Sequence, residues 1–321
     1  MAKTLEDLAL SRAYRETVLG YFGSDAMPES ILRHDKTMRS IDLIVDEHGR
    51  SYDDFTANRT EIKAFDISSR SVRAGALSRF PQSVARTLLL FYTKPGDTVV
   101  DPFAGHNSRM ELCWRANRHY IGHDISHEFM EANRKIKALL HDEVYSDMFL
   151  EHFPARITLH ECDSRHMPTP DAIGDFTITS PPYWDIEYYG DEPEQIGTGE
   201  SYEAFLRGLS EVIKDNFRCL RQGAFCVYCV NDFRKDGRFY SYHEHTADLL
   251  RAAGFVQHDV AITDLGSAFG SAFAQQMMRL KILPKRHEYA LIFRKPEANG
   301  AMTSPTLPTF TSNKQQLELS F

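Results

Sequence analysis

The sequence predicts an α/β protein with a mostly parallel sheet of seven strands, helices on both faces and an antiparallel last strand. Short runs rich in β-branched and aromatic residues alternate with stretches of helical periodicity, a pattern typical of parallel strands joined by crossover helices. The last two runs have no full helix between them, so the last strand is expected to run antiparallel. The seven runs cover residues 98–101, 119–124, 156–160, 176–179, 225–230, 256–262 and 288–293, and the clearest helical stretches are 127–140, 201–220 and 245–254.

Composition excludes several classes of protein. The chain has 321 residues, of which 42% are hydrophobic and 26% charged, enough for one large core with a small appended part. No apolar run reaches the ~18 residues of a membrane span, and acids stand near the N-terminus where a signal peptide is apolar, so a cytoplasmic protein is expected. The net charge of −8 disfavours a generic nucleic-acid coat, although a local basic surface stays open.

The five cysteines are an odd number without regular spacing, as expected in a reducing compartment. Cys226 and Cys229 form a CxxC pair. An offset of three residues places them on opposite faces of a strand, so we expect no metal site there.

Small and polar residues gather directly after three of the predicted strands. Asp101-Pro-Phe-Ala-Gly105 follows the first strand, Asp124 ends the second, and Thr179-Ser-Pro-Pro-Tyr-Trp184 ends the fourth. In an open parallel sheet the ligand crevice lies outside the carboxyl ends of the strands, where the strand order reverses. We therefore expect all three segments to converge on one crevice.

Three stretches resemble the motifs of a known family, the DNA amino-methyltransferases that modify adenine N6 or cytosine N4. FPQSVARTLLLFYTKPGDTVVDPFAG resembles the joined cofactor motifs, ITSPPYW the catalytic motif and HEYALIFRK the closing strand. The resemblance covers residues 80–295 and implies a Rossmann-like S-adenosylmethionine methyltransferase fold. It implies S-adenosylmethionine as the cofactor and double-stranded DNA as the substrate, with the target base flipped out of the duplex.

The resemblance divides the chain into three parts. Residues 76–295 are expected to form the methyltransferase catalytic domain. Residues 1–75 have a mixed pattern and are expected to be an N-terminal elaboration and a candidate recognition region. Residues 296–321 are rich in Pro, Ser and Thr and are expected to be a flexible C-terminal tail.

The resemblance also implies a set of cofactor-binding residues. Gly105 allows close backbone approach to the methionine part of the cofactor. Asp124 stands about twenty residues beyond the turn that contains Gly105, where a carboxylate can accept hydrogen bonds from both ribose hydroxyls of the cofactor. Asp163 is expected to contact the adenine amine of the cofactor. Both acids could instead be ordinary turn or cap residues. The full set is Phe80, Pro81, Asp101, Phe103, Ala104, Gly105, Asp124, Ile125, Asp163, Ser164 and Thr179. The sequence departs from the family at His106-Asn107, where small residues are usual.

Ser180, Pro181, Pro182 and Tyr183 are the expected catalytic residues. Methyl transfer to an exocyclic amine needs hydrogen-bond acceptors around the NH₂ group, and the Ser180 hydroxyl and the Pro181 carbonyl would supply them, because prolines donate no competing N–H. Tyr183 would stack on the flipped base. Trp184 would extend that stacking platform or pack in the core.

The choice of target atom is less constrained. Carbon methylation of cytosine needs a Cys nucleophile after Pro, and no Cys in this chain follows a Pro. The Ser form of the catalytic motif is commoner among the cytosine-N4 members of the family, so we favour cytosine N4 over adenine N6, as in a restriction-modification system.

Candidate DNA contacts lie outside the motifs. Residues 263–286 contain four cations and a single acid, Asp264. We expect the four cations to contact the substrate; they are Arg279, Lys281, Lys285 and Arg286. An ordinary solvated loop is the alternative. Residues 231–245 are a further candidate. By contrast, residues 185–203 carry seven acids and no Lys or Arg. This acidic segment is predicted to be mobile or folded over the pocket.

Three other functions stay open at this point. An RNA or tRNA amine methyltransferase shares the chemistry, and a catalytically inactive nucleic-acid-binding homologue shares the fold. A dinucleotide oxidoreductase is disfavoured because no GxGxxG follows the first strand. A homodimer or a complex with a partner protein stays open as well.

Overall fold

A computed structural model describes residues 29–33, 80–105, 108–146, 155–187, 189–265 and 274–298. The predictions for nearly all of residues 1–75, for His106-Asn107 and for the tail beyond residue 298 lie outside the described residues. No helix in the described ranges is long and apolar enough to cross a membrane.

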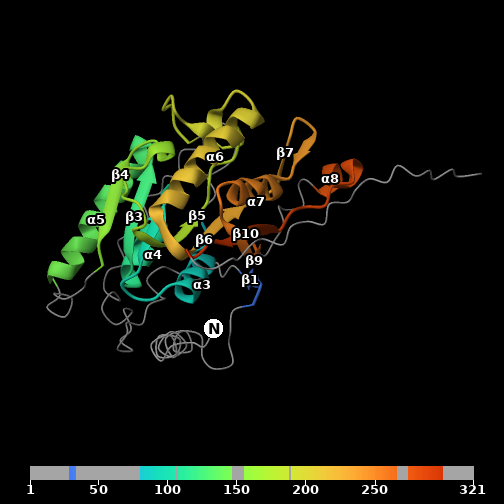
Figure 1. Cartoon of the computed structure of the whole chain (residues 1–321). Coiled ribbons are helices and arrows are strands. Elements are labelled where there is room, and N and C mark those ends of the chain that lie inside the picture. Colours follow the sequence, from blue (N-terminus) through green and yellow to red (C-terminus); the bar gives the residue numbers. More distant parts are fainter. Residues whose placement is uncertain are drawn as a thin grey trace, which may run out of the picture.

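The described chain forms an eight-stranded sheet in the order β1-β9-β10-β6-β5-β2-β3-β4 (Figure 1). All neighbouring strands are parallel except at β10, which runs antiparallel to both β6 and β9. The predicted antiparallel last strand is therefore confirmed. The strands are β1 Ile31–Arg33, β2 Thr98–Asp101, β3 His119–Asp124, β4 Ile157–Glu161, β5 Gly174–Thr179, β6 Leu220–Val230, β9 Val256–Asp264 and β10 His287–Arg294.

The sequence predicts seven of these strands, and the count is wrong by one. The additional strand, β1, comes from the N-terminal region and pairs in parallel with β9, with Ile31 opposite Ile262. Three residues carry no periodicity that a sequence pattern could reveal, and partner pairing makes this segment a strand.

Helices cover both faces of the sheet, as predicted. They are α3 Gln82–Tyr92, α4 Ser108–Arg115, α5 His127–Ser146, α6 Tyr202–Cys219, α7 Tyr242–Ala252 and the short α8 Ala274–Leu280. One core cluster joins α3, α4 and α5 to Val227 and Cys229, and a second joins α6 and α7 to Cys226 and Tyr228. Because side chains alternate along β6, the two clusters lie on opposite faces, and Cys226 and Cys229 are separated as expected.

The strand order reverses between β2 and β5. The chain runs from β2 outward to β3 and β4, then returns so that β5 pairs with the other side of β2. Gly174 begins β5 under tight packing, since a Cβ there would lie 2.7 Å from Val100 and 2.8 Å from Leu220. This order, with its antiparallel β10, is the Rossmann-like methyltransferase arrangement that the resemblance implies, and it places a ligand crevice at the carboxyl ends of β2 and β5.

A small hairpin leaves the sheet after β6. Strands β7 (Phe233–Lys235) and β8 (Arg238–Tyr240) pair through an Asp236-Gly237 turn in which both residues have positive φ angles. Asp-Gly is the residue pair that such two-residue turns favour. Figure 1 shows the hairpin extending away from the sheet, above α8.

Candidate active site

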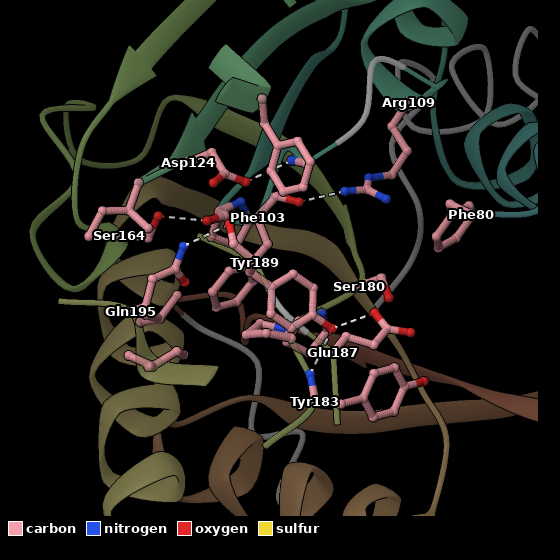
Figure 2. A pocket seen from close by; sticks show the side chains of 18 of the residues that line it. Phe80, Phe103, Arg109, Asp124, Ser164, Ser180, Tyr183, Glu187, Tyr189 and Gln195 are labelled. Atoms are coloured by element: carbon pink, nitrogen blue, oxygen red, sulfur yellow. Dashed lines mark hydrogen bonds between the residues drawn. The ribbon is translucent and has the colours of Figure 1, made fainter. Parts of the chain in front are cut away.

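A pocket lies at the carboxyl edge of the sheet, at the reversal of strand order. Its volume is about 1020 Å³, including space open to solvent. Segments that follow β2, β3, β4 and β5 all contribute to its walls, so the predicted convergence is confirmed (Figure 2). Of the predicted residues, it is lined by Phe80, Pro81, Phe103, Gly105, Asp124, Ile125, Asp163, Ser164, Ser180, Pro181, Pro182 and Tyr183.

Asp101, Ala104 and Thr179 lie behind the pocket wall rather than on it. The Asp101 side chain is fully buried, and its carboxylate accepts hydrogen bonds from Tyr120 Oη at 2.8 Å and Thr179 Oγ1 at 2.7 Å. It also accepts one from the Phe103 backbone N–H at 3.2 Å. Asp101 therefore holds the turn that forms the wall and is fully occupied in doing so.

Arg109, on α4, is a pocket residue that the sequence analysis missed. Its Nε donates to Asp101 at 2.7 Å, and its Nη2 donates to the carbonyl oxygens of Phe103 and Ala104 at 2.5 and 3.2 Å. The guanidinium also lies 5.1 Å from the centre of the Phe80 ring. The sequence feature that could have indicated this role is a cation, Arg109, placed eight residues after Asp101, the acid that ends β2. Its contacts tie the turn after β2 to α4.

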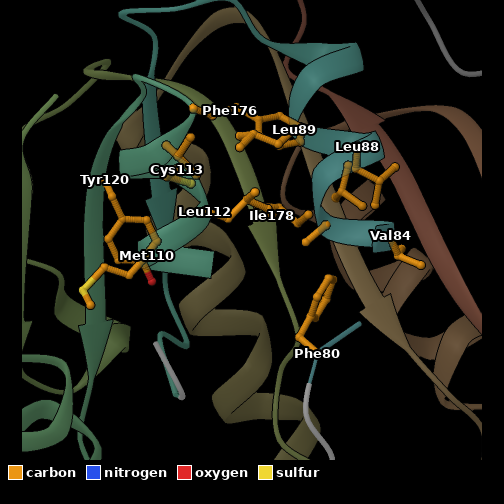
Figure 3. Packing of buried hydrophobic residues seen from close by; sticks show 14 of the residues in the cluster. Phe80, Val84, Leu88, Leu89, Met110, Leu112, Cys113, Tyr120, Phe176 and Ile178 are labelled. Atoms are coloured by element: carbon orange, nitrogen blue, oxygen red, sulfur yellow. The ribbon is translucent and has the colours of Figure 1, made fainter. Parts of the chain in front are cut away.

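Phe80 joins the hydrophobic core to the pocket. It is buried with Val84, Leu88 and Leu89 of α3 in the cluster against β5, and it also lines the pocket. Figure 3 shows its ring below those α3 side chains. Truncating such buried side chains costs about 3–5 kcal/mol, so this wall of the pocket is as firmly held as the core.

Gly105 and Asp124 form one unit. Gly105 has φ +48°, in the left-handed region that glycine adopts without strain, and its N–H donates to Asp124 at 2.8 Å. The Ser126 N–H donates to the other carboxylate oxygen at 2.9 Å. Burial nevertheless raises the pKa of Asp124 to about 6, because it outweighs these two bonds.

Asp163 lies on the pocket wall and also caps a helical turn. Its carboxylate accepts from the Arg165 backbone N–H at 2.9 Å and pairs with the Arg165 guanidinium at 2.7 Å. Burial favours a higher pKa for Asp163, but the Arg165 bonds prevail and hold that pKa below its usual value. Next to it, the buried Ser164 hydroxyl donates to the Pro102 carbonyl oxygen at 2.6 Å, which ties the segment after β4 to the turn after β2.

The segment from Ser180 to Tyr183, predicted to be catalytic, is held by hydrogen bonds to its backbone. Tyr242 Oη donates to the Pro182 carbonyl oxygen at 3.1 Å, and the Tyr183 N–H donates to Tyr189 Oη at 3.1 Å. The Tyr183 ring meets the Tyr242 ring edge-on with centroids 5.8 Å apart. The Ser180 hydroxyl has no hydrogen-bond partner among the described residues. It is the side-chain polar group of this segment left for a ligand.

Trp184 does not line the pocket, which favours the core alternative for this residue. Its Nε1 donates to the Gly199 carbonyl oxygen at 2.9 Å, and its ring packs 5.6 Å from those of Tyr202 and Tyr240. Lys235 of the hairpin lies 4.4 Å above the indole and pairs with Asp185. Trp184 thus joins the hairpin to the acidic segment.

The acidic segment is folded over the pocket, one of the two outcomes predicted for it. Its members Glu187, Tyr189, Glu194, Gln195 and Ile196 line the pocket. Glu288, the second residue of β10, lines it as well, although the closing-strand motif HEYALIFRK that contains it was given no role in the site. Because β10 is antiparallel, its first residues reach the edge at which the other strands end.

The four cations proposed for DNA lie outside the pocket lining. Arg286 pairs with Asp264 at 2.7 Å, and Lys285 Nζ lies 3.8 Å from Asp232, so both cations are partly neutralised. Arg279 and Lys281 are exposed. The hairpin adds the exposed Arg234 and Arg238 and the half-exposed Phe239 ring, which Arg234 and Lys285 approach at 5.0 and 4.9 Å.

The described residues have a Rossmann-like methyltransferase fold with a pocket at its strand-order reversal, and comparison with known sequences shows which family the chain resembles. The family model described as DNA methylase matches residues 20–135. The match spans α3, the turn after β2 and the Asp124 strand end. The resemblance to the DNA amino-methyltransferases is thereby confirmed. S-adenosylmethionine is confirmed as the cofactor of this class of protein.

Two curated relatives are DNA methyltransferases by name. The chain is 27% identical over 118 residues to the type II methyltransferase M.Cfr9I of Citrobacter freundii, a match over 33% of this chain and 39% of the relative. It is 37% identical over 59 residues to the orphan methyltransferase M.BamHII of Bacillus amyloliquefaciens, over 18% and 22% of the two chains. The matches thus span well under half the length of either relative.

Solved structures overlap the fold in part. A protein of Thermus thermophilus, assigned as a DNA modification methylase and complexed with S-adenosyl-L-methionine, is 29% identical over 45% of this chain and 56% of its own, with a TM-score of 0.32. A SAM-dependent methyltransferase of Methanosarcina mazei is 14% identical over 64% and 95% of the two chains, with a TM-score of 0.41.

Proposed function

We propose that this chain is a site-specific DNA methyltransferase that transfers a methyl group from S-adenosylmethionine to the exocyclic amine of a flipped base, with cytosine N4 favoured over adenine N6. The observation that carries the proposal is the shared pocket. The Ser180-Pro181-Pro182-Tyr183 segment and the Gly105–Asp124 unit line one cavity, so an amine acceptor site and a nucleoside cofactor site adjoin each other.

The residues in the proposed cofactor half of the pocket fit S-adenosylmethionine. Each Asp124 carboxylate oxygen accepts one backbone N–H and keeps a further lone pair for a ribose hydroxyl. Gly105 leaves its side of the turn open, with nothing within 3.8 Å of a Cβ position. Phe80, Phe103 and Ile125 offer apolar walls, and Asp163 and Ser164 close the far end. When bound, S-adenosylmethionine supplies an electrophilic methyl group on a sulfonium.

The base half is built for an amine. The Ser180 hydroxyl and the Pro181 carbonyl oxygen accept from the NH₂ group and direct the nitrogen lone pair toward the methyl group. Tyr183 stacks on the base, and its ring is held by Tyr242. Because a base inside a duplex cannot reach this pocket, the target nucleotide is extruded. The Ser form of the motif favours cytosine N4.

The DNA duplex is expected to meet the same edge of the molecule. The β7–β8 hairpin carries Arg234 and Arg238, and the segment before β10 carries Arg279, Lys281, Lys285 and Arg286 as proposed phosphate contacts. Residues 76–295 are the proposed catalytic domain, residues 1–75 the recognition region and residues 296–321 the tail. All five cysteines are free, which fits the reduced cytoplasm expected for such an enzyme.

The experiment is methyl transfer from labelled S-adenosylmethionine to separate pools of DNA and RNA, followed by digestion to nucleosides. N4-methylcytosine from DNA is the expected product. N6-methyladenine would mean that the target atom is adenine N6 and not cytosine N4. A product from RNA alone would mean that the substrate is RNA. No product from either pool would overturn the proposal in favour of an inactive binding protein.

Variants then separate the two halves of the site. Tyr183→Ala removes the stacking surface, worth ~1–3 kcal/mol per base, and should abolish most turnover while cofactor affinity changes little. Tyr183→Phe keeps the ring and is the matched control. Ser180→Ala should also lower turnover, because it removes an acceptor for the amine without opening a cavity.

A further inference from the structure

Two carboxyl groups that the sequence analysis did not assign to the site reach the base half of the pocket. Glu187 follows the catalytic segment by four residues, and Glu288 stands at the start of β10. Both line the pocket together with Ser180 and Tyr183. Glu288 reaches this edge because β10 is antiparallel to β6 and β9. The pocket therefore pairs a neutral hydroxyl, Ser180, with two acids from elsewhere in the chain.

The two acids differ in their surroundings. Tyr189 Oη donates a hydrogen bond of 2.7 Å to the Glu187 carboxylate. The Glu288 side chain has no hydrogen-bond partner among the described residues. Burial, and next the charge of Glu187, raise the pKa of Glu288 to about 7. The Glu288 carboxyl can therefore exchange a proton near neutral pH.

The other groups around Glu288 do not offset the negative charge of its carboxylate. On β6, burial raises the pKa of the Cys229 thiol above its usual value, with the charge of Glu288 adding to the effect. In the catalytic segment, burial and then Glu288 raise the pKa of the Tyr183 hydroxyl. On β9, the residue opposite Glu288 is Thr263, which carries no charge. Cys229, Tyr183 and Thr263 thus face Glu288 in uncharged form at neutral pH.

Methylation of an amine releases a proton, and the catalytic segment has no group to receive it. The amine nitrogen uses its lone pair to form the N–C bond while the C–S bond breaks and its electrons stay on sulfur. The nitrogen then carries the positive charge and must lose an N–H proton to become neutral. A serine hydroxyl accepts hydrogen bonds at neutral pH but does not retain a proton. A carboxylate whose affinity for protons is matched to the working pH suits this step.

We propose that Glu288 is a catalytic residue of this site, whose carboxylate accepts the proton released by the target amine, with the neighbouring Glu187 side chain stabilising the positive charge on that nitrogen. The inference rests on the proposed function, because it needs an amine as substrate. The proton moves from nitrogen to a Glu288 oxygen and then to solvent through the open pocket.

The test is the pH profile of single-turnover methyl transfer by the wild type and by Glu288→Gln, which keeps the shape of the side chain and removes its charge. The wild-type rate should rise through pH ~7 and level off. Glu288→Gln should be slower by about 100-fold, the low end for a positioned base, and should lack this rise. Glu200→Gln, on an exposed acid of the same segment as Glu187, is the matched control and should keep the wild-type profile.

Several outcomes would overturn the inference. If Glu288→Gln retains the wild-type rate and slope while DNA is methylated, the proposed function stands and the role of Glu288 is wrong. A wild-type rate that falls with rising pH would mean that protonated Glu288 donates a hydrogen bond to the base instead. A wild type that methylates neither DNA nor RNA removes the proposed function and this role with it.

A second measurement does not depend on turnover. The Glu288 carboxyl carbon, assigned by comparison with Glu288→Gln in ¹³C-labelled protein, should titrate near pH 7 in the free protein. A midpoint near the ordinary value of glutamate would overturn the inference even if the chain methylates DNA. Calorimetry should show equal S-adenosylmethionine affinity for the wild type and Glu288→Gln, which establishes that the variant is folded.

Discussion

Arg109 Nε donates a hydrogen bond of 2.7 Å to the Asp101 carboxylate, and both side chains are almost completely buried. The same guanidinium donates to the Phe103 and Ala104 carbonyl oxygens. One cation therefore neutralises the acid at the end of β2 and fixes the backbone of the turn that follows. This wall of the proposed cofactor site is held before any ligand binds, which lowers the entropic cost of binding.

Replacing Arg109 by Met should lower the free energy of unfolding by about 3–5 kcal/mol, because it removes the ion-pair partner of the buried Asp101 side chain. The double variant Arg109→Met, Asp101→Asn should cost less than the sum of the single changes, since the two side chains interact. Urea denaturation measures both. The matched control is Arg134→Met, whose ion pairs are about 40% exposed and contribute no more than ~1 kcal/mol. Equal losses for the two Arg variants would contradict the role of Arg109.

The local parts of this site were predictable from sequence, because parallel topology fixes where strands end. The turn that contains Gly105, the Asp124 strand end and the segment from Ser180 each follow a strand of obvious pattern, and all reach the pocket. Asp101, included among the predicted cofactor-binding residues, is buried behind the pocket wall and holds the turn. A strand-end acid and a buried acid that organises the turn look identical in sequence, and the partners Tyr120 and Arg109 distinguish them only in three dimensions.

The non-local parts were not predictable. Glu288 reaches the pocket only because β10 reverses direction and inserts between β6 and β9. Strand β1 forms only by pairing with β9. Trp184 packs with Tyr240 of the hairpin, across more than fifty residues of chain. Each depends on contacts between segments remote in sequence, and periodicity carries no information about such contacts.

Cofactor affinity should depend on the ionisation of Asp124. Burial raises the pKa of this carboxyl to about 6, so it is largely protonated at pH 5 and ionised at pH 7.5. The ionised form is the better acceptor for ribose hydroxyls, and affinity for S-adenosylmethionine should therefore rise through pH 6. Asp124→Ala should weaken binding by ~2–4 kcal/mol and remove this dependence.

Calorimetry at several pH values checks the Asp124 prediction, with the exposed Asp191→Ala as the control. An unchanged affinity in Asp124→Ala would mean that this carboxylate only closes the turn through Gly105 and Ser126. A wild-type affinity that is flat between pH 5 and 7.5, with Asp124→Ala still impaired, would assign the loss to turn structure rather than to charge.

The hairpin should contribute to DNA binding through phosphates. Replacing both Arg234 and Arg238 by Ala should weaken binding of duplex DNA and reduce the slope of log affinity against log salt by about 2, one for each contact. Arg286→Ala should change the slope less, because Arg286 already pairs with Asp264 at 2.7 Å. Fluorescence anisotropy over a range of salt concentrations measures these slopes. An unchanged slope in the double variant would mean that the duplex does not contact the hairpin through Arg234 and Arg238.

The charge of Glu288 should destabilise the folded protein at high pH. Its pKa is about 7 in the folded state against a usual value of 4.5, because burial disfavours the charged form. The folded state therefore binds this proton more tightly than the unfolded state does. The associated stability is fully present below pH 4.5 and is lost as pH rises through 7.

At pH 8.5 Glu288→Gln should exceed the wild type in free energy of unfolding by an amount on the order of 2 kcal/mol. The gap should narrow sharply at pH 5.5. Urea denaturation at the two pH values measures the difference, with the exposed Glu200→Gln expected to show none. The same gap at both pH values would assign the effect to packing of the amide and not to the charge.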